Sequence, residues 1–242
     1  ASVEITLDFS KDKNIKNALD EDFDEFVLEK GFGDEDDEVF YPLDEITAKF
    51  NLENTGRWNA NDDVDVDDIE LTACLFDTTE RECIMDEEDM ELSEDDFDLD
   101  DDDDKDLEIQ FQIDPEELNN GNSDYKLFIK AKGETDSSKE GYDKNDTAIT
   151  LTEDLEINQE EFVAIDDLRI SSPSDQDSYN CDSEIQIKGK VWNIGESDLD
   201  KDEVYVGVYN EKLGISEVID VNDLDSLESL PLEMSLTIPE GL

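Results

Sequence analysis

The sequence predicts an all-β protein with two related domains in tandem, and two observations support this prediction. Apolar and polar residues alternate strictly over residues 45–56, which indicates a half-buried strand that ends in a turn at Asn54-Thr-Gly56. The same pattern returns at residues 184–195, with Glu, Ile, Lys, Asn and Gly in the same places. One face of these strands carries Ile46, Ala48, Phe50 and Leu52 in the first copy and Ile185, Ile187, Gly189 and Val191 in the second.

The first domain is predicted to cover residues 1–158. Alternating apolar residues place its strands at residues 3–9, 45–53, 69–75, 81–85, 107–113, 127–131 and 149–157. An acidic insertion is expected at about residues 10–40, where the spacing of Phe23, Phe26 and Val27 permits a short helix. Residues 59–68 and the acidic run 86–106 are predicted to be loops.

Tyr125 stands just before the sixth of these strands, after Gly121-Asn-Ser-Asp. This position resembles the tyrosine corner of Greek-key sandwiches, where a tyrosine bonds back to the chain upstream. Together with about seven strands, it predicts an immunoglobulin-like Greek-key β-sandwich.

The second domain, residues 159–242, repeats this pattern only in part. Its predicted strands are residues 162–172, 184–192, 204–208, 215–219 and 234–238. We therefore expect a second immunoglobulin-like sandwich that lacks its last strands, with Val204, Val206 and Val208 facing water along an unpaired edge. Either the polypeptide continues past Leu242, or a strand from a neighbouring subunit completes the sheet by donor-strand complementation.

The charge of the chain excludes several kinds of partner. It carries 75 Asp and Glu against 18 Lys and Arg, a formal net charge of −57. Nucleic acid and anionic membrane surfaces would be repelled. A chain this acidic needs screening salt or bound cations, and carboxylate oxygens suit Ca²⁺ or Mg²⁺. With no His and only three Cys, zinc, haem and iron–sulfur centres are not expected.

Three acidic triplets are candidate Ca²⁺ ligands, because alternate carboxylates begin many calcium loops. None has the Gly and Glu that complete an EF-hand, so they would act as inter-strand loop sites. The alternative is a solvated acidic surface neutralised by mobile cations. The triplets are Asp63, Asp65 and Asp67; Asp96, Asp98 and Asp100; and Asp198, Asp200 and Asp202.

The cysteines and one asparagine bear on location. Cys74 and Cys83 lie on the two arms of a predicted hairpin, so a disulfide is sterically reasonable and fits an oxidising, extracellular setting. The alternative is a pair of free thiols in a cytosolic protein. Cys181 is left without a partner within this chain. Asn145-Asp-Thr147 is an N-glycosylation pattern.

Aromatic residues are expected on the outer face of the second domain. Trp192, Tyr205 and Tyr209 point away from the apolar residues of their strands. They mark a contact with another domain or subunit, or else ordinary cross-strand pairs on a wet face. No catalytic residues are assigned, since the chain lacks His and shows no nucleophile motif.

Leu52-Glu-Asn54-Thr-Gly56 and Val191-Trp-Asn193-Ile-Gly195, each followed by an acidic loop, resemble the CARDB-type immunoglobulin-like repeats of archaeal and bacterial surface proteins. The acidic, β-rich composition is similar to that of archaeal S-layer and extracellular filament proteins. This resemblance implies a structural role outside the cell, in a homo-oligomer or polymer that needs divalent cations. We therefore expect a secreted structural protein; the alternative is an adhesin or carbohydrate-binding module of a larger secreted protein.

Overall fold

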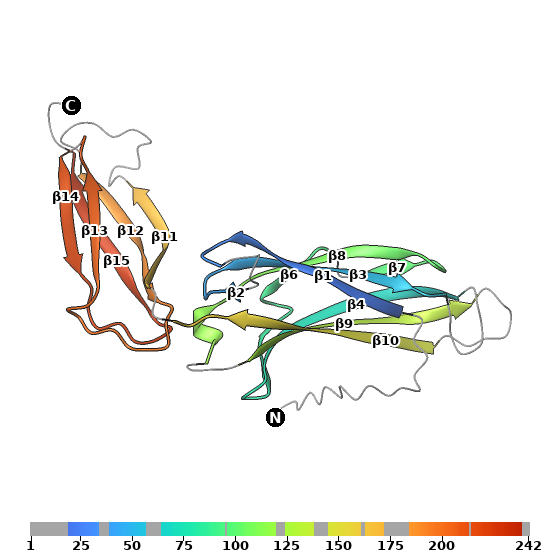
Figure 1. The fold of residues 1–242 in the computed structure, drawn as a ribbon. Coiled ribbons are helices and arrows are strands. Elements are labelled where there is room, and N and C mark those ends of the chain that lie inside the picture. The colour runs from blue at the N-terminus through green and yellow to red at the C-terminus, as the bar shows by residue number, and fades with distance from the viewer. Residues whose placement is uncertain are drawn as a thin grey trace, which may run out of the picture. The chain divides into compact units, whose positions relative to one another are not determined.

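The computed structural model describes residues 19–33, 39–56, 64–94, 96–119, 124–137, 145–160, 163–171, 184–212 and 214–238. Their regular structure is β-strand apart from one 3₁₀ turn, η2 (Pro115–Glu117), so the all-β prediction is confirmed (Figure 1). The described residues contain no helix long and apolar enough to cross a membrane. The strand expected at residues 3–9, and the candidate residues Asp63 and Cys181, lie outside the described part.

The chain forms two compact units. Unit 1 comprises Ala1–Ile113 and Ser123–Ile157, and unit 2 comprises Asp114–Asn122 and Asn158–Leu242. The main division falls between Ile157 and Asn158. The short segment that follows strand β8 is the exception, because it belongs to unit 2.

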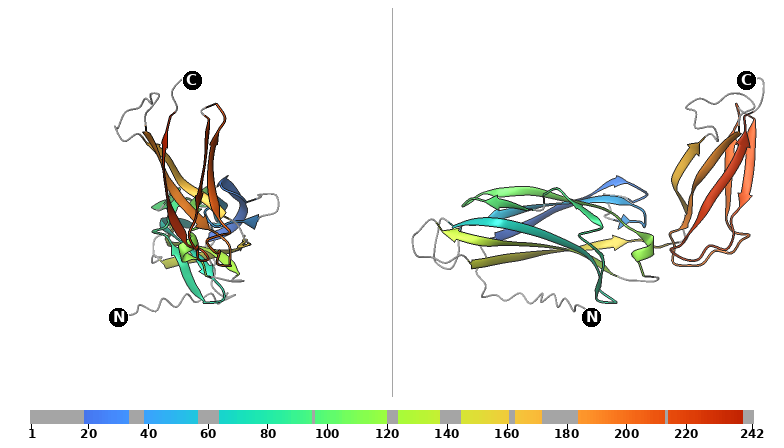
Figure 2. Two further views of the ribbon diagram at one scale, coloured as in Figure 1. Left: turned by 90° about the vertical axis from the view of Figure 1, so that its left-hand side faces the viewer. Right: turned by 180° about the vertical axis from the view of Figure 1, so that it is seen from behind.

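Unit 1 consists of two sheets that stack as layers (Figures 1 and 2). One sheet has the antiparallel order β1 (Leu19–Lys30), β3 (Glu45–Asn54), β8 (Asp104–Gln112) and β6 (Met90–Leu92). The other has the order β2 (Val39–Phe40), β10 (Asn145–Ile157), β9 (Tyr125–Ser137), β4 (Val64–Asp77) and β5 (Glu82–Asp86), and β7 (Asp96–Leu99) also pairs with β4. Only β2, among the described strands, runs parallel to its neighbour.

The apolar face of β3 lies at the centre of this sandwich, as its alternation predicts. Its residues Ile46, Ala48, Phe50 and Leu52 are at most 2% exposed. Burying a large apolar side chain stabilises the fold by about 1.5–3 kcal/mol. Tyr125 begins β9 and is 2% exposed, which agrees with its expected place at the start of that strand.

The acidic stretch that contains Phe23 and Phe26 is strand β1, so the helix expected there is wrong. β1 pairs with β3, with Phe23 opposite Phe50 and Phe26 opposite Ala48. A β-bulge shifts the register just after Phe23. Because a bulge adds one residue to a strand, it places both phenylalanines on the inner face despite their helix-like spacing of three. Their ring centroids lie 4.7 Å apart.

The acidic run 86–106 also contains strands, so the loop predicted there is wrong over much of its length. β6 and β7 lie within it, and Met90, Phe97 and Leu99 are buried. Acidic residues fill the alternate, outward positions of these short strands. β4 likewise begins at Val64, inside the loop expected at 59–68.

Unit 2 packs a three-stranded sheet against a hairpin. The sheet has the order β11 (Val163–Ser171), β12 (Glu184–Asn193) and β15 (Ser229–Thr237), and the hairpin consists of β13 (Tyr205–Asn210) and β14 (Ile215–Asp220). All five strands overlap the predicted ones. Two clusters fill the space between the layers: Val191, Val204, Val206, Val221, Leu224 and Leu232 form one, and Ile187, Ile215, Met234 and Leu236 form the other.

Val204 and Val206 do not face water, contrary to the sequence prediction, and Val208 is partly buried. Val204 and Val206 are 8% and 7% exposed, because they pack into the core cluster that contains Val191 and Leu232. The described part of unit 2 contains five strands. None of its strands continues the sheet beyond β13 in the way that β9 and β10 continue it beyond β4.

Candidate functional site

The structure brings two of the acidic triplets together. Asp65 and Asp67 lie on β4, and Asp96 and Asp98 lie on β7, which pairs with β4 in antiparallel register. Asp100 follows β7 directly. These residues therefore share one edge region of unit 1, a proximity that the sequence spacing alone did not predict.

Several of these carboxylates fasten the backbone of a neighbouring loop. Asp65 accepts a hydrogen bond from the Asp101 N–H at 3.0 Å, and Asp98 accepts one from the Asp68 N–H at 2.8 Å. Each bond joins two acidic segments of unit 1. Within the described residues, no group of three or more carboxylates or thiolates is arranged to hold a metal ion.

The third triplet lies between β12 and β13 of unit 2. Asp198 accepts a hydrogen bond from the Ser226 N–H at 2.9 Å, the same role that Asp65 has in unit 1. Asp200 donates its N–H to the Glu203 carboxylate at 2.9 Å, and Asp202 is exposed. In both units, therefore, an acidic side chain accepts a hydrogen bond from the backbone N–H of a distant segment.

Acidic residues also stand side by side across the sheets of unit 1. On one sheet, Glu53 of β3 lies opposite Asp20 of β1 and also opposite Asp104 of β8. On the other sheet, Glu134 of β9 lies between Asp67 of β4 and Asp146 of β10 in register. Like charges directly opposite in a sheet repel. These rows were missed from the sequence because only the strand register brings their members together.

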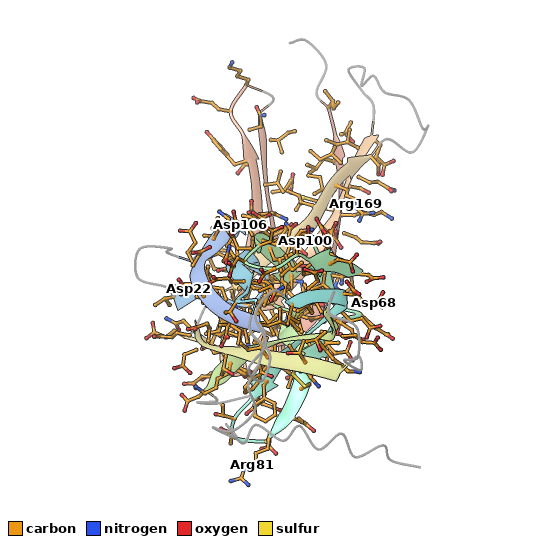
Figure 3. All side chains as sticks on the ribbon, turned by 90° about the vertical axis from the view of Figure 1, so that its right-hand side faces the viewer. Asp22, Asp68, Arg81, Asp100, Asp106 and Arg169 are labelled. Carbon is orange, nitrogen blue, oxygen red and sulfur yellow. A yellow bond between two sulfur atoms is a disulfide. The ribbon has the colours of Figure 1, made fainter. Side chains whose placement is uncertain are left out.

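The basic residues neutralise only part of this surface. Each exposed ion pair stabilises the fold by at most about 1 kcal/mol, so these pairs do little against the repulsion among the many acidic residues. Figure 3 shows carboxylates around the ribbon, with Arg81 and Arg169 labelled among them. The described pairs are Lys49–Glu25, Lys105–Glu94, Lys126–Asp154, Arg169–Asp167 and Lys188–Glu233.

Asp44 is a buried acid whose function is structural. Its carboxylate accepts hydrogen bonds from the N–H groups of Phe32 at 2.7 Å, Gly33 at 2.9 Å and Tyr41 at 2.8 Å. Gly31 has a φ of +147°, and a Cβ there would meet the Asp44 carboxylate at 1.9 Å, so only glycine fits. Desolvation by burial raises the pKa of Asp44 above its ordinary value, although the three backbone bonds act in the opposite direction.

The expected disulfide between Cys74 and Cys83 is present. It joins β4 to β5, with the two Cα atoms 5.7 Å apart. Cys74 is buried and Cys83 is exposed. Asn145, the glycosylation candidate, is the first residue of β10.

The three aromatic interface candidates have different environments. Tyr205 and Tyr209 are 70% and 72% exposed on the outer face of β13, as expected. Trp192 is only 4% exposed, so it does not offer an open surface, and the Lys190 ammonium lies 5.4 Å from its ring centroid. The sequence placed Trp192 on the correct face of its strand but did not reveal that this face is covered.

Exposed apolar side chains concentrate on unit 2. Apart from Phe32, every large apolar side chain that is exposed among the described residues belongs to this unit. Exposed apolar patches of this kind often mark interaction surfaces. They are Val163, Ile165, Leu168 and Ile170 of β11, Tyr205 and Tyr209 of β13, and Val218 of β14.

Two of the β11 residues lie on the inner face of the sandwich and are nevertheless exposed. Ile165 lies opposite Val191, which is 1% exposed, and Ile170 lies opposite Ile187, which is 6% exposed. Directly paired residues project from the same side of a sheet. Ile165 and Ile170 therefore point toward the second layer, yet they are 45% and 58% exposed.

Unit 1 shows what normally covers this position. The corresponding strand is β1, and its inner residue Phe26 is 6% exposed. Phe26 packs edge-on against Phe40 of β2, with ring centroids 5.9 Å apart. β2 and β10 belong to the opposite sheet, so it is the continuation of that sheet beyond β4 and β9 that buries the inner face of β1.

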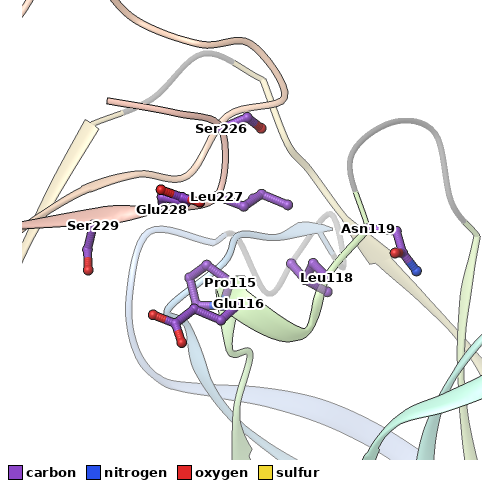
Figure 4. Close-up of a pocket in the computed structure, with 8 residues that line it drawn as sticks. All are labelled: Pro115, Glu116, Leu118, Asn119, Ser226, Leu227, Glu228 and Ser229. Atoms are coloured by element: carbon purple, nitrogen blue, oxygen red, sulfur yellow. The ribbon is translucent and has the colours of Figure 1, made fainter. Parts of the chain in front are cut away.

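A shallow depression in unit 2 offers no better site for chemistry (Figure 4). Its charged lining residues are Glu116 and Glu228, so it suits a cation or a neutral group and not an anion. None of the residues predicted from the sequence as ligands or contacts lines it. The remaining lining residues are Pro115, Leu118, Asn119, Ser226, Leu227 and Ser229.

No protein-family model matches the chain, and no curated protein matches its sequence. The proposals that follow therefore rest on its own residues and geometry.

Proposed function

We propose that the chain is a secreted structural protein that assembles into a cell-surface layer or an extracellular filament, with cations neutralising its surface. One observation supports this proposal above all others. Unit 2 leaves Ile165 and Ile170 uncovered on its inner face, whereas unit 1 buries the equivalent position. An incomplete sandwich with apolar side chains on its open side is suited to binding further polypeptide.

In this proposal both units are immunoglobulin-like sandwiches. The order β1-β3-β8-β6 in one sheet and β10-β9-β4 in the other agrees with the two-sheet order of that architecture. In unit 2, β11-β12-β15 and β13-β14 agree with the part of this order that precedes the last two strands. The repeated Asn-x-Gly turn supports a common origin of the two units.

Cations enter the proposal through the acidic rows. Glu53 between Asp20 and Asp104, and Glu134 between Asp67 and Asp146, place carboxyl-bearing residues in adjacent strands. Ca²⁺ prefers carboxylate oxygens and accommodates flexible coordination. Since the described residues form no group of three or more metal ligands, Ca²⁺ near these rows and the acidic triplets acts in this proposal by lowering the repulsion within one copy and between copies.

The Cys74–Cys83 disulfide supports an extracellular location, because such bonds persist in oxidising compartments. Glycosylation at Asn145 would be consistent with the same location.

Electron microscopy of the purified full chain tests this proposal. We expect fibres or sheets in molar salt or in millimolar Ca²⁺, and their loss in EDTA at low ionic strength. A chain that stays monomeric at every salt and Ca²⁺ concentration, at protein concentrations up to the millimolar range, would contradict it.

The alternative function, an adhesin or carbohydrate-binding module, is favoured by one feature. Tyr205 and Tyr209 project from the same face of β13, separated by Gly207, and both are more than two-thirds exposed. Exposed aromatic faces of this kind can stack on sugar rings. Calorimetric titration with soluble glycans distinguishes the two functions: binding that disappears in the variant Tyr205→Ala/Tyr209→Ala would favour the alternative.

A further inference from the structure

β13 presents an open edge whose backbone groups can be identified from the strand register. The Val221 N–H donates to the Val204 carbonyl at 3.0 Å, and these residues continue the pairing of Tyr205 with Asp220. In an antiparallel pair, residues that bond directly alternate with residues whose N–H and C=O groups point outward. Tyr205, Gly207 and Tyr209 therefore direct their N–H and C=O groups away from β14, and no described strand pairs with that edge.

This edge lacks the usual protection against pairing with another chain. Exposed edges are commonly guarded by charged side chains, proline or bulges. Residues 204–210 read Val-Tyr-Val-Gly-Val-Tyr-Asn, without a charge, in a chain with 75 acidic residues. Gly207 has open space around it, since an added Cβ would meet nothing within 4 Å. A strand from a second copy would thus meet little of the repulsion that acts elsewhere on this surface.

The chain itself contains a segment that fits the edge. Residues 3–9 read Val-Glu-Ile-Thr-Leu-Asp-Phe, with apolar residues on one face and polar residues on the other. At about 3.3 Å per residue, their length matches that of β13. In an immunoglobulin-like sandwich the first strand pairs with the second, here β3, but β3 already has β1 on one side and β8 on the other. The place expected for residues 3–9 is therefore filled.

We propose that residues 3–9 of a second copy add to the open edge of β13 and extend the sheet of unit 2. The added strand takes the place that β9 has beside β4, and its apolar face, with Val3, Ile5, Leu7 and Phe9, extends the inner face of this layer in the direction of Ile165 and Ile170. The added strand runs antiparallel to β13, as β9 runs to β4 in unit 1. Because the two contacting surfaces differ, each copy offers a segment and an edge, and the contact propagates head to tail into a filament.

This inference rests on the proposed assembly function but is tested separately from it. The first test compares Gly207→Pro with Gly207→Ala in the full chain in molar salt. Proline removes one outward N–H and leaves the bonds to β14 in place, whereas alanine keeps the N–H. We expect Gly207→Pro to raise the critical concentration for assembly at least about tenfold, and Gly207→Ala to leave it within about twofold of the original.

The second test compares Leu7→Asp with Thr6→Asp, which add the same charge to opposite faces of the segment. We expect assembly to be lost only with Leu7→Asp, because that carboxylate would be buried on the apolar inner face of the sandwich. Equal assembly by both variants would overturn the assignment of residues 3–9. Loss of assembly with Leu7→Asp but not with Gly207→Pro would overturn the assignment of β13.

A labelled peptide of residues 1–11 decides the inference even if no polymer forms. It is added to the monomeric full chain at low concentration, and binding is followed by fluorescence anisotropy. We expect binding to the original chain and to Gly207→Ala, at least about tenfold weaker binding to Gly207→Pro, and none by the Leu7→Asp peptide. Absence of binding to the original chain overturns the inference, while absence of polymers despite this binding contradicts only the proposed function.

Discussion

Asn54 and Asn193 make equivalent hydrogen bonds in the two units. Each is fully buried, and each accepts the N–H of the glycine two residues later at 3.0 and 3.1 Å. The Asn54 amide donates to the carbonyl groups of Val64, Leu99 and Asp100, and the Asn193 amide donates to those of Ser197 and Leu224. The repeated Asn-x-Gly sequence is thus a buried clamp that joins the end of one strand to distant segments of the same unit.

Replacing either asparagine by alanine is expected to destabilise its own unit by at least about 2 kcal/mol, because several buried carbonyls and one N–H lose their partner. Denaturant unfolding of Asn54→Ala and Asn193→Ala measures this loss. The control is Asn51→Ala in β3, whose amide bonds only the exposed carboxylates of Asp104 and Asp106. A loss as large in Asn51→Ala as in Asn54→Ala would contradict the clamp.

Asp44→Asn is expected to destabilise unit 1 by about 1–3 kcal/mol, because an amide has one acceptor oxygen for the three N–H groups that the carboxylate receives. The loss in free energy of unfolding, relative to the original chain, should depend on pH. Since burial raises the pKa of Asp44, the folded state holds a proton that the unfolded state releases above about 3.8. The stability from this proton is fully present below that pH and is lost as the pH rises through the folded pKa.

The deficit of Asp44→Asn should therefore be larger at pH 3.5 than at pH 7. Unfolding midpoints of both chains across this range provide the measurement. If the loss in stability instead grows with rising pH, the three backbone hydrogen bonds have a larger effect on the pKa of Asp44 than desolvation.

Glu53→Gln is expected to stabilise unit 1 by about 0.2–1 kcal/mol at low ionic strength, because it removes a charge placed opposite Asp104. The gain should vanish in molar salt or in Ca²⁺. Glu91→Gln, opposite the neutral Gln110, removes the same charge and serves as the control. Equal shifts in melting temperature for the two variants would show that the effect comes from the change in net charge and not from the acidic residue opposite Glu53.

Removing the Cys74–Cys83 disulfide by a double alanine substitution should cost unit 1 about 2–3 kcal/mol, the value that loop closure of this length implies. Non-reducing peptide mapping should find these two cysteines linked. A Cys74–Cys181 link would contradict the assignment of domains, because it joins the two units.

Strand alternation predicted most of the sheets, but three features needed information that is absent from local sequence. β1 was hidden by its bulge, which gave Phe23 and Phe26 a helical spacing. β6 and β7 were not predicted because they are short and lie in an acidic run, where only a few apolar residues alternate with the acidic ones. The burial of Trp192 could not be predicted, because a strand pattern identifies a face and not what packs on it.

The acidic sites were predictable only as residues. The triplets stand out in the sequence, but the contacts that Asp65, Asp98 and Asp198 make with distant backbone N–H groups follow from the fold. The rows centred on Glu53 and Glu134 depend on strand register, which the alternation leaves undetermined by steps of two residues.

Hydrogen exchange along β13 tests the central claim most directly. In the monomer, the amides of Val206 and Val208, which face β14, should be protected, whereas those of Tyr205, Gly207 and Tyr209 should exchange rapidly. In the assembled state all five should be protected, because the added strand accepts the outward N–H groups. Rapid exchange of Gly207 and Tyr209 in the assembly, at the rate found in the monomer, would contradict the claim that β13 is the edge that joins the copies.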